Sequence, residues 1–121
     1  MSDASRYLLV VYRAQRRDGA PVPTGHVADA VGRSPAATTE MLQRLDERGL
    51  VAHEPYEGVA LTPDGEDAAA DLQESYRTLS RFFEEVLGLD DHDEEAMRVA
   101  GTVSPAVAER LAATLLSEDG T

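Results

Sequence analysis

The chain has 121 residues, of which 42% are hydrophobic and 28% charged, and it contains no cysteine. This length predicts one domain with at most a small appendage. The lack of cysteine excludes disulfides, thiolate metal ligands and thiol redox chemistry. No apolar run reaches the roughly 18 residues of a membrane span, and the N-terminus has no signal-peptide cleavage pattern. We therefore expect a cytoplasmic protein with no membrane partner.

The charge is unusual in kind as well as in size. All eleven basic residues are Arg, against 23 Asp and Glu, and the net charge is -12 at pH 7. Such a chain is typical of a very salty cytoplasm, where bound K+ and other salt ions balance the carboxylates and electrostatic reach falls to about 3 Å at 1 M. An ordinary acidic protein from a GC-rich genome is the alternative. Residues 1–62 hold seven Arg and eight acids, whereas residues 63–121 hold four Arg and fifteen acids.

A first helix is predicted over residues 5–17, because Tyr7, Leu8, Val11 and Tyr12 recur on one face. The segment 18–23, DGAPVP, ends it. Thr24 is then expected to cap a short helix over 25–31, which Gly32 terminates.

The next helix begins with a cap followed by proline, Ser34-Pro35, and ends near Gly49. Its apolar stripe is predicted to be buried and comprises Thr38, Met41, Leu42 and Leu45. Two helices joined by a short turn containing glycine predict a helix-turn-helix.

A short hairpin follows, with strands at 50–54 and 59–61 around the turn 55–58, and it forms the wing of a winged helix. Thr62-Pro63 then starts a long helix that runs to about residue 87. This helix carries a heptad-like seam made of Leu72, Tyr76, Leu79, Phe83 and Val86. Two further helices are predicted over about 91–100 and 106–116.

The opposite face of the second motif helix is polar and suits the major groove of DNA. Gln43 pairs well with adenine, Arg44 with guanine or phosphate, and Ala36 and Ala37 with a thymine methyl. Ser34 and Thr39 suit phosphate oxygens, although both residues also serve as an ordinary cap and helix filler. The full set of predicted DNA-binding residues is Thr24, His26, Arg33, Ser34, Ala36, Ala37, Thr39, Glu40, Gln43, Arg44, Tyr56, Glu57 and Gly58.

Other function classes have less support. A winged helix also serves protein–protein contact, so the alternative is an interaction module or co-regulator that uses the seam on residues 72–86. No phosphate loop, nucleophile motif or pair of catalytic carboxylates marks an enzyme, and no catalytic residue is predicted.

Several segments together resemble the DtxR/MntR-type iron- and manganese-dependent repressors, over roughly residues 5–116. The matching segments are TEMLQRL, ERGLV, EPYEGVALTPDG, FFEEVLGL and SPAVAERL. The resemblance implies a homodimer that binds an inverted-repeat operator in double-stranded DNA. It also implies a mainly α fold, with a winged helix-turn-helix domain at 1–65 (wing at about 50–61), a helical dimerisation region at 66–116 and a frayed tail at 117–121. The implied dimer interface comprises Tyr7, Val11, Val99, Val103, Val107 and Leu111.

The residues that carry metal in this family are not kept. The first-helix ligand positions hold Arg6 and Leu9, the His of the long helix aligns with Tyr76, and the fifth-helix motif reads MRVAG at residues 97–101. Only the Met97 thioether remains, which is a weak ligand for hard ions. We therefore expect no metal cofactor. A weak site at the acidic segment 90–95 is the alternative to a hydrated helix start.

The loss of these ligands in an acidic chain also resembles haloarchaeal regulators that respond to reactive oxygen species. That resemblance implies a stress-responsive regulator whose sensing does not use a thiol. Met41 and Met97 are the internal sulfurs open to oxidation, and simple core packing is the alternative role for both.

Overall fold

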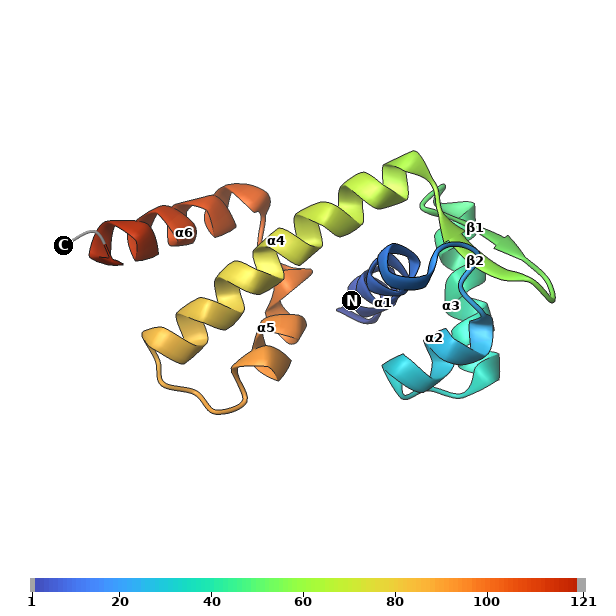
Figure 1. Cartoon of the computed structure of the whole chain (residues 1–121), viewed down its shortest axis with the longest axis horizontal. Coiled ribbons are helices and arrows are strands. Elements are labelled where there is room, and N and C mark those ends of the chain that lie inside the picture. The colour runs from blue at the N-terminus through green and yellow to red at the C-terminus, as the bar shows by residue number, and fades with distance from the viewer. Residues whose placement is uncertain (1, 120–121) are drawn as a thin grey trace. The chain divides into compact units, whose positions relative to one another are not determined.

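A computed structural model describes residues 2–119, with side chains described for 4–104 and 106–114. The chain divides into an N-terminal unit, Asp3–Ala70, and a C-terminal unit that begins at Asp71, and one long helix contributes to both (Figure 1). The elements are α1 (Ser2–Asp18), α2 (Thr24–Val31), α3 (Pro35–Glu47), β1 (Val51–Glu54), β2 (Gly58–Leu61), α4 (Pro63–Glu85), α5 (His92–Ala100) and α6 (Pro105–Asp119). The mainly α winged-helix fold is thus confirmed.

The N-terminal unit packs three helices against an antiparallel hairpin. α3 lies next to both α2 and β1 (Figure 1). The hairpin pairs Val51 with Leu61 and Glu54 with Gly58. Val22 adds an isolated bridge, because its N–H donates to the Val59 carbonyl at 2.8 Å and its carbonyl accepts from the Val59 N–H at 2.9 Å. The segment before α2, expected only to break a helix, therefore also supports the wing.

Buried aliphatic side chains hold this unit together. The largest fully buried ones are Leu9, Val11, Val27, Leu42, Leu45, Val51 and Val59, each at 2% exposure or less. Burial of one such side chain contributes about 1.5–3 kcal/mol, which makes this core the main source of stability.

The start of α4 lies directly against the residue before β1. Thr62 Oγ1 accepts from the Gly65 N–H at 3.0 Å and donates to the Gly49 carbonyl at 2.6 Å. The predicted cap-plus-proline start is therefore confirmed. A Cβ at Gly65 would lie 1.8 Å from the Leu50 carbonyl oxygen, so only glycine permits this approach.

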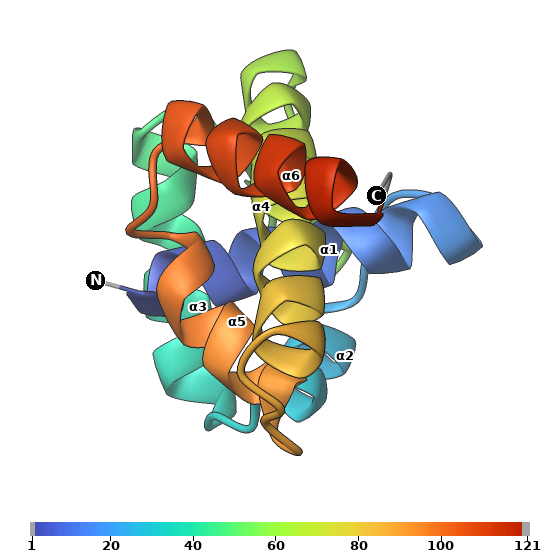
Figure 2. The same cartoon turned by 90° about the vertical axis from the view of Figure 1, so that its left-hand side faces the viewer.

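In the C-terminal unit, α5 and α6 lie beside α4 (Figure 1, Figure 2). An apolar cluster forms where Ala96 and Ala100 pack on Leu79, with exposed fractions of 0–3%. Tyr76, Phe83, Val99, Val103 and Leu111 surround this cluster. Val86, the last residue of the predicted seam, is 47% exposed in the single chain, so it does not join this cluster. None of the helices in the described residues is long and apolar enough to cross a membrane.

A polar network ties the start of α5 to α4. The Ser80 hydroxyl, in a residue only 8% exposed, donates to Asp93 Oδ1 at 2.6 Å and lies 2.8 Å from His92 Nδ1. Since the single hydroxyl proton goes to Asp93, the imidazole contact places a proton on Nδ1. The hydrogen bonds from Ser80 and then Tyr76 hold the pKa of Asp93 below its ordinary value of 3.8.

We predict that Gly65→Ala destabilises the protein by about 3 kcal/mol or more, because the new methyl group meets backbone that cannot move aside cheaply. Gly25→Ala is the matched control, since a Cβ there meets nothing within 4 Å. It should be neutral or stabilise by roughly 0.4–1 kcal/mol. Urea unfolding of both variants measures the difference, and equal stability would contradict the close approach at Leu50.

We also predict a pH-dependent effect of Asp93→Asn. A lowered folded-state pKa contributes stability above the unfolded pKa, and this contribution is lost as the pH falls through the folded-state pKa. Asp93→Asn should therefore be less stable than wild type near neutral pH, and the gap should close as the pH falls below about 4. Thermal unfolding at a series of pH values measures this difference in stability. Asp90→Asn, an exposed position with the same charge change, should show no such gap; a gap independent of pH would contradict the network.

Candidate nucleic-acid interface

The turn between α2 and α3 is set by one glycine in the left-handed region. Gly32 has φ 71° and donates its N–H to the Ala28 carbonyl at 3.0 Å, which ends α2. Glycine adopts this conformation without the strain that a Cβ brings. The chain therefore turns within three residues and starts α3 at a fixed angle to α2.

The first turn of α3 is capped as the sequence predicts. Ser34 Oγ accepts from the Ala37 N–H at 3.1 Å, and Pro35 occupies the first helical position. The cap predicted for α2 is wrong. Pro23 occupies the N-cap position without a side-chain hydrogen bond, and Thr24 is already the first residue of the helix. Thr24 lines a cleft described below.

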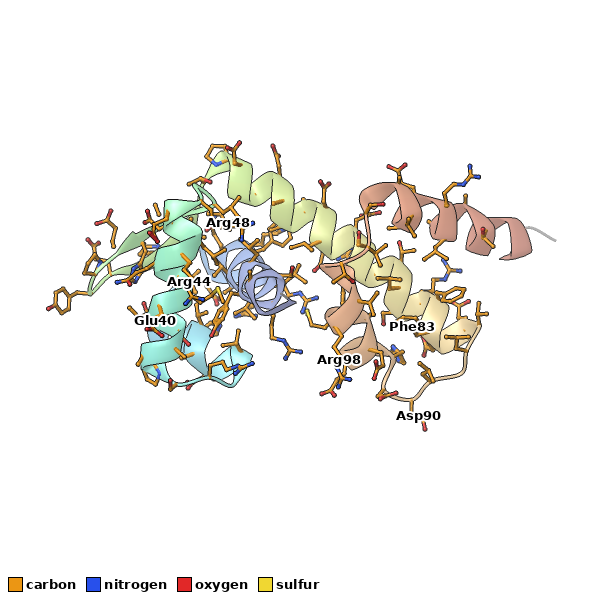
Figure 3. All side chains as sticks on the ribbon, turned by 180° about the vertical axis from the view of Figure 1, so that it is seen from behind. Glu40, Arg44, Arg48, Phe83, Asp90 and Arg98 are labelled. Atoms are coloured by element: carbon orange, nitrogen blue, oxygen red, sulfur yellow. The ribbon has the colours of Figure 1, made fainter. Side chains whose placement is uncertain are left out.

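α3 has one buried and one exposed face. Thr38, Leu42 and Leu45 are 0% exposed, and Met41 is half-buried, so the predicted stripe is confirmed. The opposite side, which we call the reading face, is formed by Ala36, Glu40, Gln43 and Arg44. Glu40 and Arg44 follow one another along α3 in Figure 3, and Arg48 caps its C-terminal end.

The polar side chains of the reading face are not used inside the protein. Within the described residues, no hydrogen bond or ion pair engages the side chains of Glu40, Gln43 or Arg44. Their donors and acceptors therefore remain available to a partner in solution. Arg33 is exposed in the turn before this face, and Ala37 and Thr39 are half-buried at its margins.

A cleft of about 510 Å³ separates α3 from the wing. It is lined by Pro23, Thr24, Gly25, Thr39, Gln43, His53, Pro55, Tyr56, Glu57 and Gly58. Asp46 Oδ2 accepts from the His53 N–H at 2.8 Å and so holds β1 to α3 beside this cleft. The structure thus brings together predicted residues from three elements and adds His53, which was not in the predicted set. No local pattern around His53 points to this location.

The wing exposes two of its three predicted residues. Tyr56 has φ 71° and is 107% exposed, and Glu57 is also exposed. Gly58 is buried, and a Cβ there would lie 2.3 Å from the Val22 carbonyl oxygen. Gly58 therefore shapes the base of the wing, and it offers little surface to a partner.

His26 lies exposed near the start of α2 and gains a basic neighbour in the structure. Its Nε2 is 3.3 Å from Arg17 Nη2, while Arg17 Nε pairs with Asp18 at 3.0 Å. Arg17 was absent from the predicted set, because its position next to α2 depends on how α1 packs.

The residues predicted for the dimer interface differ in exposure. Tyr7 and Val11 are 3% and 0% exposed within the single chain, which leaves their side chains no surface to offer a second chain. Val99, Val103 and Leu111 pack around the apolar cluster and are half-buried. Val107 is 50% exposed.

The positions that the resemblance assigns to metal ligands do not fit a divalent ion. Leu9 and Ala100 are 0% and 2% exposed hydrocarbon side chains, and Tyr76 packs at the apolar cluster. Arg6 would place a fixed cation at the site. In the acidic segment 90–95, as in the rest of the described chain, no group of three His, Asp or Glu side chains is placed to hold an ion.

Comparison with known proteins agrees with the winged-helix architecture. Residues 1–59 match the family described as iron dependent repressor, N-terminal DNA binding domain, and residues 62–117 match its metal binding and dimerisation domain. An uncharacterised HTH-type transcriptional regulator of Methanocaldococcus jannaschii is 33% identical over 107 residues, which cover 87% of this chain and 86% of that protein.

Other relatives are longer. The transcriptional regulator MntR of Lysinibacillus sphaericus is 31% identical over 85 residues, which cover 70% of this chain and 56% of MntR. The solved manganese regulator SloR superposes with a TM-score of 0.81 at 29% identity, covering 93% of this chain and 53% of SloR. The chain thus spans about half the length of these two relatives. Two consecutive family domains and a relative matched over most of both lengths lead to one conclusion: the chain belongs to the iron-dependent repressor family, whose members are DNA-binding transcription regulators rather than enzymes.

Proposed function

We propose that this protein is a homodimeric, sequence-specific DNA-binding transcription regulator that works in a cytoplasm of high salt without a bound divalent metal. The observation that carries the proposal is the reading face of α3, whose polar side chains have no intramolecular use among the described residues. A helix of this kind fits the major groove when its supporting helix and wing hold it rigidly.

The chemistry of the reading face supports readout of bases. Gln43 suits bidentate pairing with adenine and Arg44 with guanine, while Ala36 and Ala37 allow close approach to a thymine methyl. Ser34 and Thr39, with Thr24, His26 and Arg33 nearby, suit the phosphates that fix register. The cleft between α3 and the wing offers room for one backbone strand, with Tyr56 and Glu57 at its outer rim.

Dimerisation would present two such faces, and two-fold symmetry requires an inverted-repeat operator. We place the dimer contact on the C-terminal unit, where Val107 exposes an apolar side chain next to the half-buried Val103 and Leu111. The match of residues 62–117 to a dimerisation domain supports this placement.

High salt changes what drives binding. The release of counterions from DNA normally supplies much of the affinity, and this contribution fades as the salt concentration rises. The N-terminal segment of residues 1–62 is nearly neutral, with seven Arg and eight acids, so it does not repel DNA strongly. We therefore propose that groove contacts and shape dominate, with K+ ions bridging nearby carboxylates and phosphates. A stress- or redox-responsive role stays a prediction of the sequence.

Metal independence rests on the residues at the family's ligand positions. Buried hydrocarbon at Leu9 and Ala100 offers no lone pair, and Arg6 repels a cation. The acidic segment is engaged otherwise, since Asp93 and His92 both contact Ser80.

We predict that Arg44→Ala lowers affinity for a selected operator by about 10- to 100-fold, because a bidentate contact to guanine contributes about 1–3 kcal/mol. Arg98→Ala is the matched control with the same charge change, and it should bind within about twofold of wild type since Arg98 lies in the C-terminal unit. Fluorescence anisotropy in molar KCl measures both. If the two variants lose affinity equally, the effect of Arg44 comes from its charge alone and not from a contact with guanine. If the protein forms a stable complex with another protein but binds no duplex, it is an interaction module.

We predict that Mn(II), Fe(II) and a strong chelator leave operator affinity and thermal stability unchanged, because no described cluster of ligands is placed to hold these ions. Mg(II) at the same concentration controls for ionic strength. Loss of binding on chelation, restored by Mn(II) but not by Mg(II), would overturn metal independence.

A further inference from the structure

We propose that Glu40 is a specificity-determining residue whose carboxylate accepts a hydrogen bond from the N4 amino group of a cytosine in each half-site. The inference rests on the proposed function and extends it to one base. A contact of this kind would explain why a negatively charged side chain lies in the middle of a surface that faces negatively charged DNA.

The location of Glu40 places its carboxylate on the side of α3 that would face the groove floor if α3 enters the major groove. Glu40 lies four residues, about one turn, after Ala36 on the exposed side of α3. Arg44 follows about one turn later (Figure 3). Ala36 is small and lets the first turns approach the bases closely. Thr38 and Leu42 are buried on the opposite side of the same turns, and their burial keeps Glu40 on the exposed side.

Among the described residues, Glu40 also has no intramolecular partner. Arg44 follows four residues later, a spacing at which Glu and Arg often pair, with a gain of about 0.3–0.5 kcal/mol. No ion pair joins Glu40 to any described residue. The carboxylate therefore enters a complex with all its acceptor positions unfilled.

An ionised carboxylate only accepts hydrogen bonds, and this restricts the bases it tolerates. In the major groove, guanine presents the acceptors N7 and O6 and thymine presents O4, so both repel it. Adenine offers its N6 amino group between the acceptor N7 and the O4 of its paired thymine, whereas cytosine offers its N4 amino group at the outer end of the pair, with an acceptor on one side only. Cytosine is therefore the base that matches Glu40 best.

Desolvation strengthens the discrimination. Removing a charge from water without a new hydrogen-bond partner costs free energy. A mismatched base at this position therefore weakens binding by more than the loss of one hydrogen bond. Glu40 thus excludes wrong bases as well as selecting the right one. Four helical residues span about 6 Å, so Arg44 would read a guanine one or two base steps from the cytosine.

The test is selection from a random duplex pool in molar KCl with wild type, Glu40→Gln and Glu47→Gln. Wild type should enrich cytosine at one position of each half-site. Glu40→Gln should lose this preference by about 10- to 100-fold or shift it to adenine, because an amide pairs with adenine. Glu47→Gln, an exposed change of the same charge in the last turn of α3, should keep the wild-type motif.

The outcomes separate the inference from the function on which it rests. A wild-type motif that Glu40→Gln retains at every position overturns the role of Glu40 and leaves the proposed function standing. Uniformly tighter binding by Glu40→Gln to all duplexes also overturns it, since the carboxylate then acts only by repelling phosphate. No enriched motif with wild type overturns both. Equal melting temperatures are expected for the three proteins, because Glu40 loses no partner in the described part of the chain, and they establish that folding is not the cause.

Discussion

Burial of one side of α3 is the constraint on which the rest of the candidate interface depends. Thr38, Leu42 and Leu45 have no exposed surface, and successive helical residues are rotated by about 100°. Burying this stripe therefore directs Glu40 and Arg44 outward. Asp46 also accepts a hydrogen bond from the His53 N–H, which links β1 to the same helix. The start of α4 packs at Gly65 against the Leu50 carbonyl. A packed helix, unlike a loop, presents its side chains in one fixed arrangement, which readout of bases requires.

The distribution of charge suits this arrangement. Most of the acid lies in residues 63–121, which carry fifteen acids, and the segment with α3 is nearly neutral. At high salt, long-range attraction to DNA contributes little, so discrimination depends on contacts at hydrogen-bond distance. A carboxylate such as Glu40 costs less there than at low salt, because its repulsion from phosphates is screened while its short-range preference among bases persists.

The C-terminal unit keeps the family architecture with different chemistry. Ala96 and Ala100 pack on Leu79, and the Ser80 hydroxyl bonds to Asp93 at the start of α5. These contacts hold α5 on α4 through packing and hydrogen bonds. Leu9 and Ala100 convert two ligand positions into hydrocarbon, which stabilises the fold but removes the donors that an ion needs.

The sequence by itself determined the order of helices, the capped start of α3 at Ser34 and the buried stripe of that helix, because each depends on residues within a few positions of one another. Tertiary structure decided the rest. Val22 pairs with Val59, Pro23 takes the cap position expected for Thr24, and Val86 turns outward at the end of the predicted seam. The close approaches that require Gly58 and Gly65, and the position of His53 at the cleft, involve segments far apart in the chain. Local patterns do not encode such contacts, since they arise only when separate elements pack together.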